Sequence, residues 1–347
     1  MKISFFIGSM GSGGAERVIS ILANHYAKKK WDVDIVVLLN NKVSYELNKR
    51  VHIVDFSNKG SYMKNSLIWL KNIRKYVQKV QPDRIVSFIG RINILVLTAT
   101  LGMDIPVIVS ERNDPKHDGR GKLLQMYGNI CYKYATAIVF QTNYEKQCFN
   151  STLNDISYVI PNPVSIDSER KKSEKIKIVT AGRLVPQKNQ KLMIKSMKYL
   201  INKYPEAVLK IYGDGTLKNE LKKTIDEQGL HKNIELCGNV KDIHKRIADA
   251  TMFILSSDYE GLSNALIEAM MMGLPCISTD YPGANEIIIN RENGILVPCN
   301  DERALSQAML EIIENNKLSE RLSINAQEES QKYKKEVVLR KWEEVIE

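Results

Sequence analysis

The residues best suited to chemistry lie in the segment 258–275, which reads DYEGLSNALIEAMMMGLP. Glu260 falls in the loop after an expected strand at 252–256, and Glu268 falls about a turn and a half inside the helix that follows. Apolar residues surround Glu268 in that helix, so an unpaired carboxylate there would be costly. The loop also brings the amides of Gly261, Leu262, Ser263 and Asn264 to the helix N-terminus. The carboxylates there can accept hydrogen bonds from sugar hydroxyls, and the amides can donate hydrogen bonds to a phosphate.

Two further loops follow expected strands in the same half of the chain. The loop after the strand at 176–181 carries Arg183 and Lys188, and two cations at this spacing can bracket a diphosphate. The turn Gly213-Asp-Gly215 follows the next strand. Taken alone both loops are weak signals, because loop cations are usually solvated and glycine turns are common. The carboxyl ends of parallel strands meet at one edge of a sheet, so we expect the three loops to gather there.

The N-terminal segment 8–17, GSMGSGGAER, is a flexible loop that leads into a helix. Free N–H groups and the helix dipole make such a loop a ready anion site, although a tight strand-to-helix turn is an equally good interpretation. A dinucleotide-binding loop is disfavoured, because Glu16 stands where the third glycine or alanine is needed and Asn40-Asn41 follow the next strand in place of an acid. The absence of a Gly-Lys-Ser/Thr triplet excludes a Walker loop.

Asp32-Val-Asp34 has the spacing of a metal-binding DxD motif. It lies at the start of an expected strand, where alternation would place both carboxylates on one solvated face. We therefore interpret this pair as structural and expect no metal site.

Short β-branched runs alternate with amphipathic stretches along the chain, which predicts an α/β fold with parallel sheets covered by helices on both faces. The expected strands lie at 2–7, 33–39, 51–54, 84–88, 107–110, 137–141, 157–160, 176–181, 208–212, 234–237, 252–256, 276–279 and 295–297. Helical patterns include Glu16–Lys29, Asn65–Val80, Gln190–Lys203 and Leu217–Gln228. A proline-rich segment near 160–164 predicts a linker, and hence two doubly wound, Rossmann-like domains at 1–165 and 166–330 that face each other across a cleft. Residues 331–347 form a last helix whose docking the sequence leaves open.

The net charge of +10 is unevenly distributed. Residues 1–165 hold 22 Lys and Arg against 12 Asp and Glu, whereas residues 166–347 hold 28 of each. The acid-free segment 56–82 carries a basic stripe, because four of its lysines fall within about 80° of one another on a helix: Lys64, Lys71, Lys75 and Lys79. Such a stripe is either a solvated face or a surface for an anionic partner. A nucleic acid is the weaker choice of partner, since no recognised binding module accompanies the charges.

The composition, with 44% apolar residues, is that of a globular protein and excludes collagen, disulfide miniproteins and disordered tails. The five cysteines are scattered and form no CxxC pair, which favours a reducing compartment and argues against structural zinc. No run of about 18 apolar residues occurs, so we expect no membrane span.

Together the motifs resemble those of retaining glycosyltransferases of family 4, which have the GT-B fold. The resemblance covers nearly the whole chain and rests on Gly13-Gly14-Ala-Glu16, Arg183…Lys188, Gly213-Asp-Gly215 and Glu260…Glu268, in the family's order. It implies that Arg183 and Lys188 hold the donor diphosphate while Glu260 binds the transferred sugar. It further implies that Glu268 binds the ribose hydroxyls, that Gly213 and Val240 line the nucleobase pocket and that Gly14 approaches the donor phosphate. The amides of Leu262, Ser263 and Asn264 would help Glu260 to bind the transferred sugar, and Gly261 belongs to the same donor site.

Within the family the chain is most similar to bacterial enzymes that extend undecaprenyl-diphosphate-linked oligosaccharides, including α-N-acetylgalactosaminyl transferases. The segments Gly13-Gly-Ala-Glu-Arg17 and Val109-Ser-Glu111 carry this similarity. It implies an acceptor side that comprises Gly13, Glu111, Arg112, Asn113, Lys64, Lys71, Lys75 and Lys79. Many relatives have a histidine where Arg112 stands here.

The same similarity implies transfer of a hexose or N-acetylhexosamine from a UDP-sugar, without a cofactor or metal, to a lipid-diphosphate-linked glycan. It also implies a cytoplasmic protein on the anionic inner face of the bacterial membrane, with no nucleic-acid partner. A GT-B enzyme with a non-lipid acceptor, a related epimerase or phosphorylase, and a non-catalytic nucleotide-sugar-binding protein remain alternatives. Neither the donor sugar, the linkage nor the oligomeric state follows from the sequence.

Overall fold

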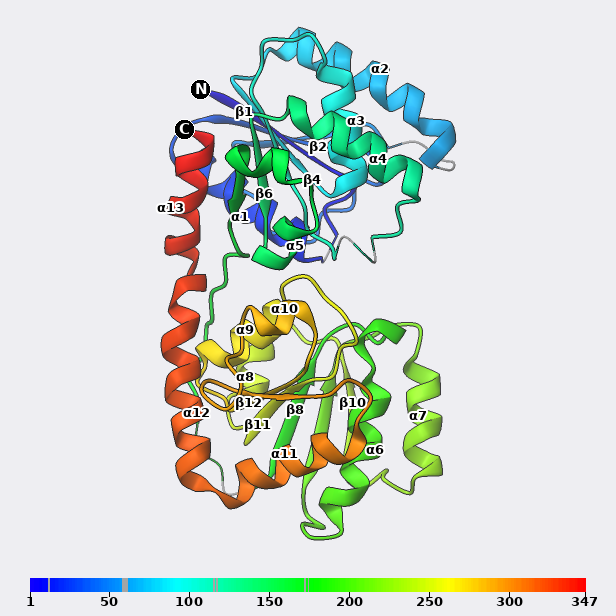
Figure 1. The fold of residues 1–347 in the computed structure, drawn as a ribbon, viewed down its shortest axis with the longest axis vertical. Coiled ribbons are helices and arrows are strands. Elements are labelled where there is room, and N and C mark those ends of the chain that lie inside the picture. Colours follow the sequence, from blue (N-terminus) through cyan, green and yellow to red (C-terminus); the bar gives the residue numbers. More distant parts are fainter. Residues whose placement is uncertain (12, 58–61, 115, 117, 172, 174) are drawn as a thin grey trace. The chain divides into compact units, whose positions relative to one another are not determined.

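The computed structural model describes residues 1–11, 13–57, 62–114, 116, 118–171, 173 and 175–347, with the backbone alone for 62–64. The chain divides into two compact units (Figure 1). Unit 1 comprises Met1–Pro163 together with Glu336–Glu347, and unit 2 comprises Val164–Lys335. The sequence did not show which domain the last helix packs against; this helix belongs to unit 1.

Unit 1 is built on a seven-stranded parallel sheet in the order β3-β2-β1-β4-β5-β6-β7. Its strands are β1 (Lys2–Ile7), β2 (Asp32–Val37), β3 (Val51–Asp55), β4 (Arg84–Phe88), β5 (Val107–Ser110), β6 (Ala137–Phe140) and β7 (Ser157–Val159). Its helices are α1 (Gly14–Lys28), α2 (Tyr62–Val80), α3 (Gly90–Thr100), α4 (Lys122–Cys131), α5 (Asn143–Gln147) and α13 (Lys335–Ile346), with short 3-10 helices η1 (Tyr132–Tyr134) and η2 (Ser151–Ile156).

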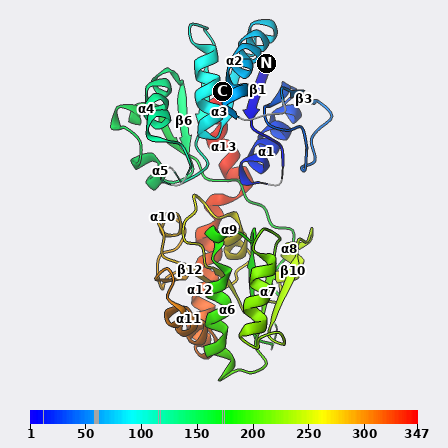
Figure 2. The ribbon, with the colours of Figure 1, turned by 90° about the vertical axis from the view of Figure 1, so that its right-hand side faces the viewer.

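Both faces of this sheet are covered, and strands β1 to β6 place side chains in two separate cores. In β1 the side chain of Phe5 enters one core and that of Phe6 enters the other, as the two-residue period of a strand requires. Helices α1 and α13 close the first core, where Trp342 is fully buried. Helices α2, α3 and α4 close the second. Figure 2 shows α13, in red, alongside the strands of unit 1.

Unit 2 repeats the plan with a six-stranded parallel sheet in the order β10-β9-β8-β11-β12-β13. Its strands are β8 (Lys177–Ala181), β9 (Val208–Tyr212), β10 (Ile234–Gly238), β11 (Met252–Leu255), β12 (Cys276–Thr279) and β13 (Ile295–Val297). Its helices are α6 (Gln190–Ile201), α7 (Lys218–Glu227), α8 (Ile243–Ile247), α9 (Asn264–Met271), α10 (Pro282–Asn285), α11 (Glu302–Glu314) and α12 (Asn316–Glu329), with η3 (Pro186–Lys188) and η4 (Ser330–Tyr333).

The α/β class and the doubly wound parallel sheets expected from the sequence are confirmed. All thirteen expected strands are present with ends shifted by two residues at most, because buried parallel strands are near-continuous apolar runs that a sequence shows plainly. The interpretation of Asp34 as solvated is wrong. Its carboxylate is buried, accepts a hydrogen bond from the Tyr76 hydroxyl at 2.5 Å and lies 3.4 Å from the Lys2 amine. Helix α2 covers that face of the sheet, so the alternate side chains of β2 that point to this face do not reach water.

Candidate functional site

Three loops of unit 2 leave the carboxyl ends of the neighbouring strands β9, β8 and β11. The loop after β8 carries Arg183 and Lys188, and hydrogen bonds hold its shape. The Gln190 side-chain amide donates to the Arg183 carbonyl at 2.9 Å within the loop. Leu184 donates its N–H to the Asp214 carbonyl at 2.9 Å, which joins the loops after β8 and β9 at one edge of the sheet.

Lys188 and Glu260 form an ion pair at this edge. The Lys188 Nζ lies 2.6 Å from the Glu260 Oε2, and the two side chains are 14% and 11% exposed. The Ser257 hydroxyl donates to the other carboxylate oxygen, and the Ser256 hydroxyl donates to the Lys188 carbonyl at 2.8 Å. The two charges therefore belong to one connected arrangement, held by both loops and still in contact with solvent.

Arg183 differs from Lys188, because its side chain is exposed. In the described part of the chain no ion pair or side-chain hydrogen bond is assigned to its guanidinium. A planar guanidinium in this state is available to form forked contacts with a phosphate.

Gly213 shows why the turn after β9 contains glycine. Its φ of 134° is a conformation that other residues rarely adopt, and a Cβ at this position would stand 1.9 Å from the Gly182 carbonyl oxygen. The Gly213 N–H donates to the Gly238 carbonyl at 2.8 Å. This close approach draws the end of β10 to the same edge, and the half-buried Val240 follows just beyond it.

The helix after Glu260 begins as expected, with Ser263 at the N-cap of α9. The Ser263 side chain makes no capping hydrogen bond, so the first-turn N–H groups are not satisfied by their own cap. Gly273, with φ of 73°, ends the helix, and its N–H donates to the Met270 carbonyl at 2.9 Å. A Cβ on Gly283 would stand 2.0 Å from the Gly261 carbonyl oxygen, so α10 backs directly onto the Glu260 loop.

Glu268 is buried in α9 and has a partner that the sequence analysis missed. The Nε2 of His244, on α8, lies 3.4 Å from the Glu268 carboxylate, and the Nδ1 lies 2.7 Å from that of Asp167. Burial disfavours the charged imidazole, but the hydrogen bonds and charges of Glu268 and Asp167 outweigh it and raise the pKa of His244. No motif marks His244 in the sequence, since the three residues come from distant segments.

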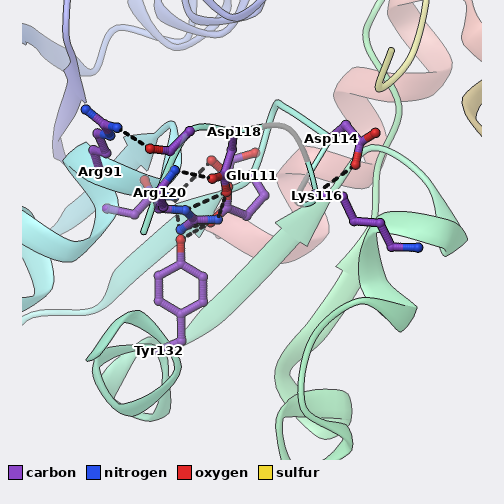
Figure 3. A network of polar contacts seen from close by, with 10 residues as sticks. Arg91, Glu111, Asp114, Lys116, Asp118, Arg120 and Tyr132 are labelled. Carbon is purple, nitrogen blue, oxygen red and sulfur yellow. Dashed lines mark hydrogen bonds and ion pairs between the residues drawn. The ribbon is translucent and has the colours of Figure 1, made fainter. Parts of the chain in front are cut away.

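In unit 1, Glu111 follows β5 and is the centre of a buried network (Figure 3). Its carboxylate lies 3.1 Å from the Arg120 Nη1 and accepts a hydrogen bond from the Tyr132 hydroxyl. Arg120 also contacts the Asp118 carboxylate at 2.5 Å. Burial raises the pKa of Glu111, although the charge of Arg120 acts in the opposite direction. The network ties Asp118, Arg120 and Tyr132 to the end of β5.

Arg112 is also buried, whereas Asn113 is exposed. The Arg112 guanidinium lies over two rings, 5.0 Å from the Phe88 centroid and 5.4 Å from that of Trp342, and donates to the Asn162 side chain at 2.8 Å. Burial lowers the pKa of Arg112 to about 9. Arg112 therefore helps to attach α13 to the sheet of unit 1.

The glycine-rich loop and the basic stripe also lie in unit 1. Gly13 is the N-cap of α1, Gly14 is the first residue of that helix, and the Glu16 side chain folds back toward Gly13. On α2 the side chains of Lys71, Lys75 and Lys79 are exposed, while Trp69 and Ile73 are buried on the opposite face. The side chain of Lys64 lies outside the described part of the chain.

Neither a metal site nor a membrane-spanning helix is found in the described residues. Within those ranges no three His, Cys, Asp or Glu residues gather as a metal site would require. No helix in the same ranges combines the length and apolar character needed to cross a bilayer.

Comparison with known proteins agrees with this architecture. The sequence model "Glycosyltransferase Family 4" matches residues 12–168, and "Glycosyl transferases group 1" matches residues 162–329. The crystal structure of Anabaena HepE in complex with UDP and glucose superposes with a TM-score of 0.84 at 19% identity, covering 99% of this chain and 98% of that one.

Two relatives come from Campylobacter jejuni. One is named as the GalNAc-α-(1→4)-GalNAc-α-(1→3)-diNAcBac-PP-undecaprenol α-1,4-N-acetyl-D-galactosaminyltransferase, and it is 26% identical over 100% of this chain and 98% of its own. The other is the N-acetylgalactosamine-N,N'-diacetylbacillosaminyl-diphospho-undecaprenol 4-α-N-acetylgalactosaminyltransferase, 28% identical over 91% of each chain. Matched across both units and folded as two parallel-sheet domains, the chain belongs to the GT-B glycosyltransferases of family 4.

Proposed function

We propose that the protein transfers a hexose or N-acetylhexosamine, such as GalNAc or GlcNAc, from a UDP-sugar to a lipid-diphosphate-linked glycan. The reaction would retain the anomeric configuration and need neither a metal nor a cofactor. It would take place at the inner face of the bacterial membrane, in the synthesis of a cell-surface polysaccharide or a glycoprotein glycan. The two Campylobacter relatives, which are named for transfer to undecaprenyl-diphosphate-linked acceptors, support this substrate class.

The observation that carries the proposal is the Lys188–Glu260 pair beside the exposed Arg183. Breaking a sugar–diphosphate bond leaves negative charge on the outer phosphate, and cations held in place at that point stabilise the charge. A diphosphate that arrives at this edge competes with Glu260 for Lys188. Once Lys188 turns to the phosphate, the Glu260 carboxylate is free to accept hydrogen bonds from the sugar hydroxyls.

The other groups of the site position the donor. Glu268, held by His244, is suited to accept hydrogen bonds from the ribose hydroxyls. The amides at the start of α9 add to the positive potential that the diphosphate meets. With Glu260 assigned to positioning, the acceptor hydroxyl attacks from the face that the diphosphate leaves, which retains the configuration without a covalent intermediate.

The test is a panel of UDP-sugars incubated with the purified protein and a polyprenyl-diphosphate-linked glycan, with free UDP as the readout. We expect UDP release with one or a few donors, unchanged in the presence of EDTA, and an α-linked product by NMR. Donor binding without UDP release would instead identify a non-catalytic nucleotide-sugar-binding protein, and an inverted product would contradict the mechanism.

A further inference from the structure

Helix α4 of unit 1 presents an apolar face to solvent. The α4 apolar row consists of Leu123, Met126, Tyr127 and Ile130 on the helix and Tyr134 on η1, exposed by 82%, 64%, 43%, 53% and 64%. On a helix that advances about 100° per residue, the four positions of α4 fall within an arc of about 100°, and Tyr134 follows on η1, which continues directly from α4. They form a continuous row rather than isolated exposed side chains.

Apart from Tyr127, whose hydroxyl lies 3.0 Å from the Thr98 hydroxyl on α3, the row is not needed to attach α4 to the domain. A separate face of the helix performs that task, with Gly128 and Cys131 buried against the second core and Leu124 partly buried. The Gly128 position is in close contact, since a Cβ there would stand 2.9 Å from the Ile94 side chain. Contiguous exposed apolar surface is uncommon on soluble monomers and marks a surface that binds something.

The charges around the row identify an anionic partner. Segment 119–144 contains no acidic residue, and its Arg120 is already paired with Glu111 and Asp118, so Lys122 and Lys133 supply the free positive charge. Lys122, on the first turn of α4, and Lys133, on η1, are exposed and flank the row at its two ends. Tyrosine side chains suit the interface between the hydrocarbon core of a membrane and water, because their rings are apolar and their hydroxyls are polar.

Helix α2, in the same helix layer (Figure 1), has the same character. Its segment is acid-free, its lysines Lys71, Lys75 and Lys79 are exposed, and Leu67 and Ile68 are exposed by 76% and 47%. Both helices that flank α3 thus combine exposed apolar side chains with uncompensated positive charge.

We propose that the α4 apolar row inserts into the interfacial layer of an anionic lipid bilayer, with Lys122 and Lys133 at the level of the lipid phosphates. This inference deepens the proposed function, on which it rests for a membrane-held acceptor, by assigning the element that docks. An amphipathic helix that lies in the membrane plane buries such a row among the acyl chains and headgroups. A second copy of the chain fits less well, because a twofold contact would bring the same lysines together.

The experiment compares two double variants of the full-length protein. Leu123→Ser with Ile130→Ser removes an exposed apolar side chain near each end of α4, and Tyr199→Ser with Ile324→Ser removes two exposed apolar side chains from unit 2. Binding to vesicles of phosphatidylethanolamine and phosphatidylglycerol is measured by flotation, with phosphatidylcholine vesicles for comparison. We expect the α4 variant to bind the anionic vesicles at least about tenfold more weakly and the unit 2 variant to bind like the unmodified protein.

Equal binding by both variants, or no vesicle binding by the unmodified protein, would overturn the inference. So would a change from dimer to monomer in the α4 variant with unchanged vesicle binding, measured by light scattering, because the row would then be a contact between copies. UDP release in detergent solution separates this result from the proposed function, since the α4 variant should retain it. Loss of vesicle binding without any UDP release from the unmodified protein would contradict only the proposed reaction.

Discussion

Each unit has a glutamate just beyond a strand of its parallel sheet, and the two glutamates meet different surroundings. Glu260 pairs with Lys188 at 2.6 Å, and the partners are 11% and 14% exposed. Glu111 pairs with Arg120 at 3.1 Å, and the partners are 1% and 5% exposed. Glu111 also accepts a hydrogen bond from Tyr132, and burial raises its pKa.

The difference lies in what a ligand can reach. A pair that remains in contact with water can exchange partners at modest cost, so Lys188 and Glu260 can each turn to a different part of a donor. Separating the partners of a buried ion pair is costly, because each charge is then left buried without an opposite charge beside it. The same residue type after a strand therefore stays within reach of a ligand in unit 2 and forms a buried structural contact in unit 1.

The largest expected effect on stability comes from removing the buried glutamate. Glu111→Ala leaves Arg120 with Asp118 alone and the Tyr132 hydroxyl without its acceptor, so we expect a loss of about 3–5 kcal/mol in the free energy of unfolding. Glu260→Ala should cost about 1 kcal/mol or less, because water can solvate Lys188. Urea unfolding of both variants measures the difference. Similar losses in the two variants would remove the distinction between the two sites.

A smaller effect tests the same network without changing a charge. A Cβ at Gly90 would stand 2.2 Å from the Arg120 Nη1 and 2.8 Å from the Glu111 Oε1, so Gly90→Ala should push the pair apart. We expect about 1–3 kcal/mol of destabilisation in urea. Gly121→Ala is the matched control, since nothing lies within 4 Å of a Cβ at that position. If Gly90→Ala were as stable as Gly121→Ala, the pair would not be tightly packed.

The smallest effect is a pH dependence in unit 2. The pKa of His244 is raised in the folded state, so its contribution to stability is fully present below the unfolded pKa of about 6.5 and is lost as the pH rises through the folded value. His244→Gln should flatten the stability–pH curve in that window and raise the KM for the donor more than it lowers kcat. The exposed His231→Gln is the control. An unchanged curve in His244→Gln would contradict the assigned link to Glu268.

The sequence predicted the strands and the gathering of loops in unit 2 because both depend on local patterns. Apolar runs mark buried strands, and parallel topology places their carboxyl ends together. Contacts between distant segments left no such mark. His244 with Asp167 and Glu268, and Arg112 between the Phe88 and Trp342 rings, are tertiary pairings.

Local patterns also did not predict which side chains are buried. Asp34 looked solvated because its strand position was known but the helix that covers it was not. Helix α4 has apolar residues on two faces, and only the packing shows that Leu123 and Ile130 are on the exposed one.

The central claim, that the strand-end site of unit 2 transfers a sugar, is tested most directly by steady-state UDP release from Arg183→Ala, Lys188→Ala and Glu260→Ala. The matched control is Lys191→Ala, which opens the exposed Lys191–Glu220 pair nearby on α6. We expect each site variant to lose about 10²–10³-fold in kcat/KM, while the control stays within about twofold of the unmodified protein. Near-normal turnover in all three site variants, with intact folding by circular dichroism, would contradict the account.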